Sequence, residues 1–480
     1  MSISSDLLFE KWKEQQTAVE QMIPLIGLLY RENGVTISFF GRRLLNHSAI
    51  DIIKAHRFAI QMVGEELEVS KSLALIQAMI KMNLAPAQVD LGKLCYGFMQ
   101  EKGNPEAYLK EPLASINTGK SSILKEPQDV VLYGFGRIGR LLARMMIERA
   151  GSGNKMRLRA IVVRGGNNKG DLKKRASLLR RDSVHGAFSA SITVDEEENA
   201  IIADGVYIKV IYANSPSEVD YTKYDIHNAL VVDNTGLWRD MDELGQHTKC
   251  PGAAKVILTA PGKGTVKNIV YGVNHDDVEL SDTILSAASC TTNAIAPVLK
   301  AINNKFGIIN GHMETVHSYT NDQNLIDNYH KGDRRGRSAP LNMVLTSTGA
   351  AEAVAKCLPE LKGKLTGNAL RVPTPNVSLA IINLNLKQDI SKDEINNYLR
   401  QMALNSPMQD QIDYTTSSEL VSSDLVGSTH AGVVDSLATI TDGNRLVLYV
   451  WYDNEYGYSS QVIRLMLDVA GLKKPVVPAV

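Results

Sequence analysis

Cys290 and His317 are the side chains of this sequence best suited to covalent chemistry. Cys290 follows a serine and precedes two threonines and an asparagine (residues 289–293), between a predicted strand and a helix predicted to begin near Asn293. A helix N-terminus lowers the pKa of a thiol, and a thiolate is the nucleophile that attack on an aldehyde requires. His317 ends a predicted strand and is either the base of this pair or only a hydrogen-bonding residue. A lone cysteine is more often a small core residue, and we interpret the others in this way: Cys95, Cys250 and Cys357.

A glycine-rich turn between a strand and a helix is the second feature with chemical meaning. The first glycine permits a tight turn, the second lets a pyrophosphate approach the backbone, and the third allows close packing of helix and sheet. The helix N-terminus then presents free N–H groups to the phosphates. The pattern alone also fits an ordinary glycine-rich loop, but its place between strand 130–132 and helix 140–149 favours a dinucleotide site. The predicted cofactor-binding residues here are Gly134, Phe135, Gly136, Arg137, Ile138 and Gly139.

The end of the next predicted strand, 159–163, bears on which dinucleotide binds. An acidic residue at this place holds the ribose 2′-hydroxyl of NAD, whereas a basic residue accommodates the 2′-phosphate of NADP. Here the strand is followed by Arg164 and two glycines, and Asp171 comes too late in the sequence to replace the missing carboxylate. The sequence therefore predicts that NADP is admitted, with Arg164 as a partner of its phosphate or, alternatively, as a solvated loop residue.

The elements that must position these residues fall into a predicted series of domains. Residues 1–125 have helical periodicity and end in a linker rich in Pro, Gly, Ser and Lys. Strands and helices alternate over residues 126–289, which predicts an α/β, Rossmann-type doubly wound parallel sheet, completed by a C-terminal helix over 455–480. Residues 290–454 have longer strands and predict an α+β catalytic domain with a mainly antiparallel sheet.

Composition excludes several classes of partner. The chain has 480 residues, and its Lys+Arg and Asp+Glu counts are equal at 52 each, so no nucleic acid or anionic membrane is expected as an obligate partner. The four cysteines fit neither a zinc site nor a disulfide framework, and we expect no metal and a reducing, cytoplasmic setting. No run of residues has the length and apolar character of a membrane helix.

Taken together, the motifs closely resemble the phosphorylating glyceraldehyde-3-phosphate dehydrogenase family from about residue 127 onward. The separation of 27 positions between Cys290 and His317 (317 − 290) matches the family's spacing of nucleophile and base. The family has no counterpart of the helical N-terminal extension, residues 1–125. The motifs occur in the family's order: GFGRIGR (134–140), RDSVHG (181–186), SCTTN (289–293), HSYTNDQ (317–323), RRGR (334–337), TSTGAA (346–351), LRVPTPNVS (370–378) and WYDNEYGYS (451–459).

The resemblance implies a reaction and a set of residues. Cys290 would attack glyceraldehyde 3-phosphate, His317 would act as base, hydride would pass to the nicotinamide, and inorganic phosphate would cleave the resulting thioester. Thr320 and Arg371 would bind the C3 phosphate of the substrate. The attacking phosphate would be bound by Ser289, Thr291, Arg335, Thr348 and Gly349. Further cofactor contacts would come from Thr235, Gly236, Thr259, Asn454 and Tyr458.

Three departures from the family pattern bear on the cofactor. Tyr133 replaces the usual Asn before the glycine motif, Arg164 and Gly165 replace Asn-Asp, and residues 328–329 are Asn-Tyr instead of Leu-Pro. In the family, the Asp and the Leu-Pro pair accompany strict use of NAD. Their joint absence implies NADP or dual use and allows a gluconeogenic direction.

The resemblance also implies a homotetramer, so we expect self-association. Two other functions are weighed against the expected one. An erythrose-4-phosphate dehydrogenase would share the scaffold and Cys290, although residues 348–351 keep the family's phosphate-site sequence. A regulatory or scaffold protein would act through residues 1–125, although the intact Cys290, His317, Arg335 and Arg371 argue against a dead enzyme.

Overall fold

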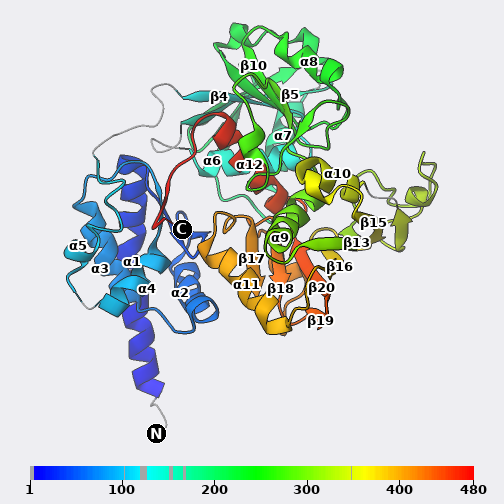
Figure 1. Ribbon diagram of the computed structural model, residues 1–480. Coiled ribbons are helices and arrows are strands. Elements are labelled where there is room, and N and C mark those ends of the chain that lie inside the picture. The colour runs from blue at the N-terminus through cyan, green and yellow to red at the C-terminus, as the bar shows by residue number, and fades with distance from the viewer. Residues whose placement is uncertain are drawn as a thin grey trace. The chain divides into compact units, whose positions relative to one another are not determined.

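The computed structural model describes residues 5–101, 103–118, 127–150, 155–165, 169–346 and 349–479. The chain divides into two compact units, coloured by residue number in Figure 1. The first lies within residues 1–127, 150–155 and 471–480, and the second comprises residues 128–149 and 156–470. No helix among the described residues combines the length and the apolar character needed to cross a membrane.

The first unit packs five helices around a small sheet. The long helix α1 buries Val19, Met22, Ile26 and Leu29, which lie on one helical stripe. Ser48 and Asp51 form a capping box at the start of α2. The helices are α1 (Ser5–Asn33), α2 (Ala49–Val63), α3 (Val69–Ile80), α4 (Leu91–Glu101) and α5 (Pro105–Tyr108). The sheet has the order β2-β1-β3-β21, with β1 (Thr36–Phe39), β2 (Arg42–Arg43), β3 (Gln88–Asp90) and β21 (Val476–Val477).

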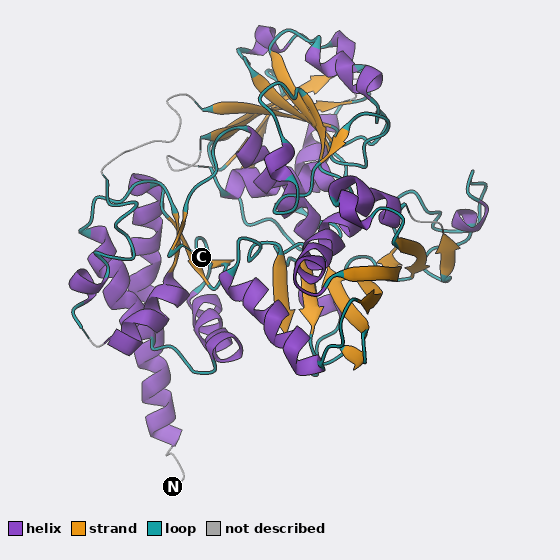
Figure 2. Cartoon of the chain, viewed as in Figure 1, coloured by secondary structure: helices purple, strands orange, loops and turns teal. Residues whose placement is uncertain are grey.

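A nine-stranded sheet forms one half of the second unit (Figure 2). Its order is β11-β12-β10-β9-β4-β5-β8-β7-β6, parallel from β11 to β8 and antiparallel in the two last pairs. The strands are β4 (Gln128–Tyr133), β5 (Met156–Val163), β6 (Ile192–Asp195), β7 (Ala200–Ala203), β8 (Val206–Tyr212), β9 (Ala229–Asp233), β10 (Ala253–Leu258), β11 (Lys267–Asn268) and β12 (Ile284–Ser286). The helices are α6 (Arg137–Glu148), α7 (Asp171–Arg180), α8 (Met241–Thr248) and α12 (Tyr456–Val469).

The order of this sheet reverses between β4 and β9. From β4 the chain moves to β5 on one side, and from β9 it moves to β10 on the other. Right-handed crossovers therefore place α6 and α8 on opposite faces of the sheet, as Figure 1 shows. The carboxyl ends of β4 and β9 frame the crevice in which doubly wound sheets bind their ligands. The predicted Rossmann-type fold is confirmed.

An eight-stranded, mainly antiparallel sheet forms the other half, also as predicted. Its path is β14-β15-β13-β16-β20-β18-β17, and β19 pairs with β20. Only the pairs β13–β15 and β17–β18 are parallel among the described residues. The strands are β13 (Ile308–Ser318), β14 (Val344–Thr346), β15 (Leu365–Val372), β16 (Ser378–Leu386), β17 (Ile412–Thr415), β18 (Gly432–Asp435), β19 (Ile440–Asp442) and β20 (Arg445–Tyr452). The helices are α9 (Cys290–Phe306), α10 (Ala350–Cys357) and α11 (Lys392–Asn405).

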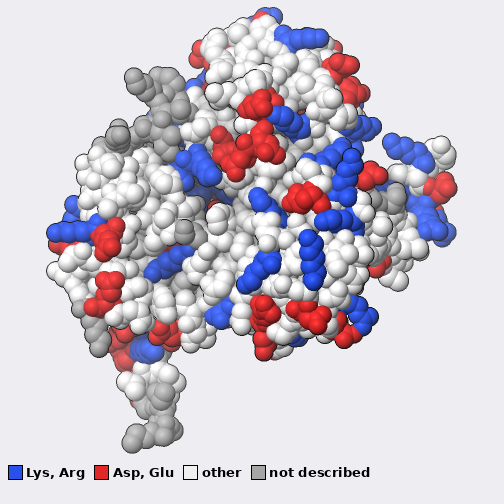
Figure 3. All heavy atoms as spheres, in the orientation of Figure 1, with Lys and Arg blue, Asp and Glu red and all other residues white. Residues whose placement is uncertain are grey.

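Charges of both signs are interspersed on the face shown in Figure 3. Short 3-10 turns complete the described structure. The 3-10 turns span Pro216–Glu218, Tyr221–Tyr224, His275–Asp277, Asp333–Gly336, Pro359–Leu361 and Ser422–Leu425.

The C-terminal helix is shorter than the predicted span 455–480. It ends at Val469, and Gly471 has a positive φ of 66°, which a helix cannot continue through. Residues 476–477 then pair in parallel with β3 of the first unit. The predicted span was too long because it ran through Gly471, Pro475 and Pro478, which are signals of a helix end.

Candidate active site

Cys290 is the first residue of α9, three residues earlier than the predicted start of this helix. Ser289 is the N-cap, and its Oγ accepts a hydrogen bond from the backbone N–H of Thr292 at 3.1 Å. Ala288, between β12 and the cap, has a φ of 55°, so the chain turns sharply before the helix. The cysteine therefore lies where the helix N-terminus presents its free N–H groups.

His317 lies beside Cys290, as the two motifs predicted. Its Nε2 is 3.5 Å from the Sγ of Cys290, and its Nδ1 is 2.7 Å from the carbonyl oxygen of Ser318. Nδ1 also lies 2.6 Å from Nη1 of Arg371, a group that can only donate. In the tautomer whose Nδ1–H donates to the Ser318 carbonyl, the lone pair of Nε2 faces the sulfur. Strand β13 carries His317, and in the neighbouring strand β15 its register partner is Arg371. The Nη1 of Arg371 donates to the Ser318 carbonyl at 2.9 Å.

The protonation of this pair differs from the sequence-based expectation of a lowered thiol pKa. Burial raises the pKa of Cys290, and the guanidinium of Arg371 opposes that rise. Burial also lowers the pKa of His317 to about 3, and Arg371 acts in the same direction. At neutral pH the thiol therefore keeps its proton and the imidazole is uncharged, so the geometry suits transfer of the thiol proton to Nε2.

Arg335 reaches the same region from the turn that follows β13. It forms an ion pair with Asp322 at 2.5 Å, and its Nη2 donates to Thr346 Oγ1 at 3.2 Å. Thr320 Oγ1 also donates to Asp322. Asp322 was not singled out from the sequence, although it lies inside the motif HSYTNDQ. Its role as shared partner of Thr320 and Arg335 depends on the path of the loop, which no spacing rule describes.

Two of the remaining residues expected at the phosphate sites, Thr291 and Gly349, lie in different environments. Thr291 is buried, and its Oγ1 lies 2.9 Å from the hydroxyl of Tyr452, a residue that sequence reasoning missed. Gly349 is the residue before the first turn of α10. Thr348 lies outside the described residues.

The glycine motif adopts the geometry that each glycine predicts. Gly134 has a φ of 95°, and a Cβ at Gly139 would lie 2.3 Å from the carbonyl oxygen of Gly134. At Gly136 a Cβ would meet no atom within 4 Å, so its backbone is open to a ligand. Arg137 and Ile138 begin α6, and the Arg137 guanidinium is directed to Glu455 and Asp182.

A cavity of about 270 Å³ opens at the ends of β4 and β5, beside the glycine motif. Arg164, which is exposed, is one of the residues that line it. Asp171, by contrast, is engaged: it accepts from Arg175 Nε at 2.6 Å and from the Tyr212 hydroxyl at 2.9 Å. The cavity is lined by Tyr133, Gly134, Phe135, Val162, Val163, Arg164, Arg175, Thr235 and Leu237.

Asp233, fully buried at the end of β9, shapes the floor of the crevice. It accepts from the backbone N–H and the Oγ1 of Thr235, both at 2.7 Å, and pairs with His247 at 3.0 Å. Gly236 follows with a φ of 64°, and Thr259 Oγ1 donates to the Asp233 carbonyl at 3.1 Å. The three predicted residues Thr235, Gly236 and Thr259 therefore meet at one edge of the sheet.

Asn454 lies in the segment that joins β20 to α12, and Tyr458 lies in the first turn of α12. Asn454 is buried, and its Oδ1 accepts from Ser378 Oγ at 2.8 Å. The hydroxyl of Tyr458 donates to the carbonyl of Ala288 at 3.0 Å, so this residue supports the turn before Cys290. No group of three or more potential metal ligands occurs within the described ranges.

The fold and the site together define a class of protein. A doubly wound sheet with a glycine-rich turn at its switch point binds a dinucleotide, and a thiol beside an imidazole provides a nucleophile at the boundary with the second sheet. Such a fold and site define the class of dinucleotide-dependent oxidoreductases.

Comparison with known proteins identifies the family within this class. The family model for the NAD binding domain of glyceraldehyde 3-phosphate dehydrogenase matches residues 128–241, and the model for its C-terminal domain matches residues 289–454. The chain therefore belongs to the glyceraldehyde-3-phosphate dehydrogenase family and is an NAD-dependent oxidoreductase.

Curated relatives differ in how much of the chain they match. A glyceraldehyde-3-phosphate dehydrogenase-like protein of Pseudomonas aeruginosa (strain UCBPP-PA14) is 62% identical over 462 residues, which cover 95% of this chain and 100% of the relative. Glyceraldehyde-3-phosphate dehydrogenase of Zymomonas mobilis is 41% identical over 71% of this chain and 98% of its own length. The chloroplastic glyceraldehyde-3-phosphate dehydrogenase A of Zea mays is 42% identical over 70% of this chain and 81% of its own length. At 95% coverage, the Pseudomonas match must include most of residues 1–125.

Proposed function

We propose that this protein catalyses the reversible oxidative phosphorylation of D-glyceraldehyde 3-phosphate to 1,3-bisphosphoglycerate through a thioester on Cys290. The observation that carries this proposal is the 3.5 Å approach of His317 Nε2 to the Cys290 sulfur, beside the guanidinium of Arg371. An uncharged imidazole within reach of a thiol is the arrangement that nucleophilic attack on an aldehyde requires.

The chemistry divides into an oxidation and a phosphorolysis. The sulfur of Cys290 attacks C1 of the aldehyde, and the thiol proton passes to His317 Nε2. The nicotinamide, when bound, accepts hydride from C1. His317 first returns the thiol proton to the former carbonyl oxygen, which becomes the hydroxyl of a hemithioacetal, and takes it back as hydride leaves C1, so that a thioester remains on Cys290. An oxygen of inorganic phosphate then attacks the thioester carbonyl, the sulfur leaves, and the acyl phosphate is released.

Two phosphate groups require two sets of donors. We assign the C3 phosphate to Thr320 and Arg371, and the attacking phosphate to Ser289, Thr291, Arg335, Thr348 and Gly349. Guanidinium and hydroxyl groups suit this role because they give directional, charge-assisted hydrogen bonds. The ion pair with Asp322 compensates the charge of Arg335 when the site is empty. On phosphate binding, Arg335 would exchange this partner for the phosphate.

NADP is proposed as a second cofactor beside NAD. Arg164 stands at the cavity rim where a ribose 2′-substituent would lie, and no carboxylate lines the described cavity. Asp171 is held by Arg175 and Tyr212, so its carboxylate is not offered to the ribose. A basic rim favours the 2′-phosphate and removes the usual partner of the 2′-hydroxyl.

We further propose a homotetramer in the cytoplasm. The segment between β13 and β15 exposes large apolar side chains to an extent unusual for a monomer. Burial of such a surface against a second copy of the chain is favourable. The exposed fractions are Leu325 75%, Ile326 74%, Tyr329 91%, Leu341 81% and Met343 72%.

Steady-state oxidation of glyceraldehyde 3-phosphate, with NAD or NADP and with or without inorganic phosphate, tests the proposal. Phosphate-dependent turnover with both dinucleotides is expected. Turnover with NAD alone would refute the role of Arg164 but keep the reaction. A preference for erythrose 4-phosphate, or turnover that ignores phosphate, would replace the proposed substrate and reaction. Absence of turnover with either sugar would favour a regulatory or scaffold protein that acts through residues 1–125.

Cys290→Ala should abolish oxidation and leave dinucleotide affinity unchanged, because the sulfur forms the covalent bond but does not touch the sheet edge. Turnover and dinucleotide titration measure the two effects. Cys95→Ala is the matched control, since Cys95 is buried in α4 of the first unit, which carries none of the proposed site residues. Wild-type turnover in Cys290→Ala would refute the thioester mechanism.

A further inference from the structure

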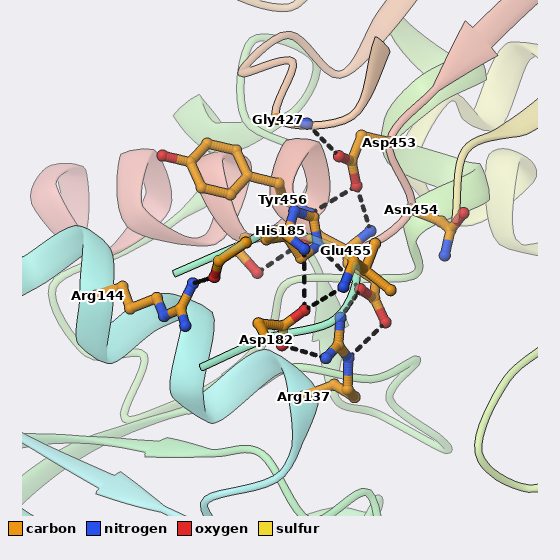
Figure 4. A network of polar contacts seen from close by, with 12 residues as sticks. Arg137, Arg144, Asp182, His185, Gly427, Asp453, Asn454, Glu455 and Tyr456 are labelled. Carbon is orange, nitrogen blue, oxygen red and sulfur yellow. Dashed lines mark hydrogen bonds and ion pairs between the residues drawn. The ribbon is translucent and has the colours of Figure 1, made fainter. Parts of the chain in front are cut away.

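Four charged or titratable side chains form a network that the proposed reaction does not use. Arg137, Asp182, His185 and Glu455 point toward one another in Figure 4, and we call them the Arg137 network. Arg137 is the first residue of α6, and Glu455 is the residue before the first turn of α12. Asp182 and His185 come from the motif RDSVHG after α7, to which no role was assigned.

Glu455 is the centre of the network. Its Oε1 accepts from Arg137 Nε at 2.9 Å, and its Oε2 accepts from Arg137 Nη2 and lies 2.9 Å from His185 Nε2. Arg137 Nη1 donates to Asp182, whose other oxygen accepts the backbone N–H groups of Val184 and His185. The Arg137–Glu455 contact is a two-point fork, which fixes direction as well as distance.

The network is shielded from solvent, so its interactions are strong. The side chains of Asp182, His185 and Glu455 are only 6%, 4% and 15% exposed. Burial alone would raise the pKa of Glu455, but hydrogen bonds from His185 and Arg137 hold it below its usual value. Burial opposes ionisation of Asp182 as well, yet backbone hydrogen bonds and Arg137 lower its pKa to about 2.

Glu455 follows Asn454 in the sequence, and Asp453, the residue before Asn454, also holds this segment in place. Asp453 Oδ1 accepts the backbone N–H groups of Glu455 and Tyr456 at 2.9 and 2.7 Å, and its Oδ2 accepts that of Gly427 at 2.8 Å. Asn454 is thus held between Asp453 and Glu455, and its side chain is aligned by Ser378.

We infer that the Arg137–Glu455 pair is a positioning device for the dinucleotide, which fixes the phosphate-binding start of α6 relative to Asn454 at the nicotinamide end. The inference rests on the proposed role of Asn454 toward the nicotinamide. Arg137 and Glu455 are positioning residues, because neither needs to touch the reacting atoms. The pair connects two segments that lie more than three hundred residues apart in the sequence (455 − 137 = 318) and that are expected to bind the two ends of one flexible ligand.

The test compares Arg137→Gln, Glu455→Gln and the milder Arg137→Lys with the control Arg157→Gln. Arg157 forms an ion pair with the buried Asp129 at 2.8 Å. Both residues lie near the N-terminal ends of β4 and β5, whereas the glycine motif follows the C-terminal end of β4. The control therefore removes an arginine–carboxylate ion pair away from the glycine motif. Three quantities are measured on the full chain: the Kd of NAD, the deuterium isotope effect on kcat with aldehyde labelled at C1, and the thermal midpoint.

Both Gln variants should weaken NAD binding at least about tenfold and raise the isotope effect, because a displaced nicotinamide makes hydride transfer rate-limiting. Arg137→Lys, which keeps the charge but not the fork, should fall between these variants and the wild type. The effect of the double variant should fall short of the sum of the two single effects, since both single variants remove the shared Arg137–Glu455 contact. Arg157→Gln should lower the thermal midpoint but change neither NAD affinity nor the isotope effect.

Wild-type NAD affinity and isotope effect in Arg137→Gln and Glu455→Gln would overturn the inference and leave a purely stabilising role. If a Gln variant does not fold, Arg137→Lys decides the matter by the same two readouts. If the wild-type chain does not oxidise the triose phosphate, the proposed function fails, whereas the NAD affinities of the variants still decide whether the network positions the dinucleotide.

Discussion

Arg371 acts on both Cys290 and His317, and its Nη1 lies 2.6 Å from Nδ1 of His317. Its positive charge favours the ionised thiol of Cys290 and disfavours the protonated imidazole of His317. Its own pKa is lowered by burial. A single guanidinium therefore offsets part of the rise that burial causes in the thiol pKa. The same charge keeps the imidazole unprotonated, so that it can accept a proton.

Arg371→Gln should raise the pKa of Cys290 further, because the largest opposing influence is removed. Alkylation by iodoacetamide, an uncharged reagent, follows the thiolate, so the inflection of its pH–rate profile should move to higher pH. Arg335→Gln is the control, since Arg335 contacts Asp322 and Thr346 and should leave the inflection nearly in place. A shift to lower pH in Arg371→Gln would contradict this account.

At the scale of single residues, the sequence predicted which side chains meet but not how their environment acts on them. The approach of Cys290 and His317 follows from two motifs at the ends of predicted elements. The direction of the thiol pKa did not follow, because burial depends on everything packed around the sulfur. Asp322 and Glu455 escaped notice since each gains its role from partners brought close only by the fold.

The N-cap of α9 is the element-scale feature that presents Cys290. Ser289→Ala should cost about 1 kcal/mol in the free energy of unfolding, measured with urea, because the cap hydrogen bond to the Thr292 N–H is lost. It should also change the alkylation rate of Cys290, which begins the same helix.

Ser391→Ala is the matched control for this prediction. Ser391 caps α11 by accepting from the Glu394 N–H at 3.2 Å, so its loss should cost a similar free energy. The thiol should not respond, because α11 does not carry it. Equal changes in alkylation rate for the two variants would mean that the cap of α9 has no specific effect on Cys290.

At the scale of elements, long periodic segments were predictable and short ones were not. Strand 159–163 was predicted with the end that β5 has, because its apolar run is continuous and two glycines follow soon after it. The sheet of β1, β2, β3 and β21 was not predicted, since strands of two to four residues show no period that sequence can reveal.

At the scale of the whole molecule, the second unit contains both large sheets and the described residues of the site. Two of its hydrophobic clusters are built from residues between 131 and 452, without any from residues 1–127. A chain of residues 127–470 should therefore fold and keep its kcat/KM for the triose phosphate. Circular dichroism and steady-state kinetics check this expectation, with the full chain as reference. Failure to fold would show that the extension is an integral part of the enzyme.

The strand β21 has a consequence for how the chain is made. Its partner β3 belongs to the segment that leaves the ribosome early, whereas β21 follows the entire second unit in the sequence. Until then the edge of β3 stays open, and open strand edges pair with those of other chains. A translation product that stops before residue 476 would lack β21, so the backbone groups at the edge of β3 would stay unpaired. Aggregation should therefore begin with incomplete chains more readily than with denatured full-length protein.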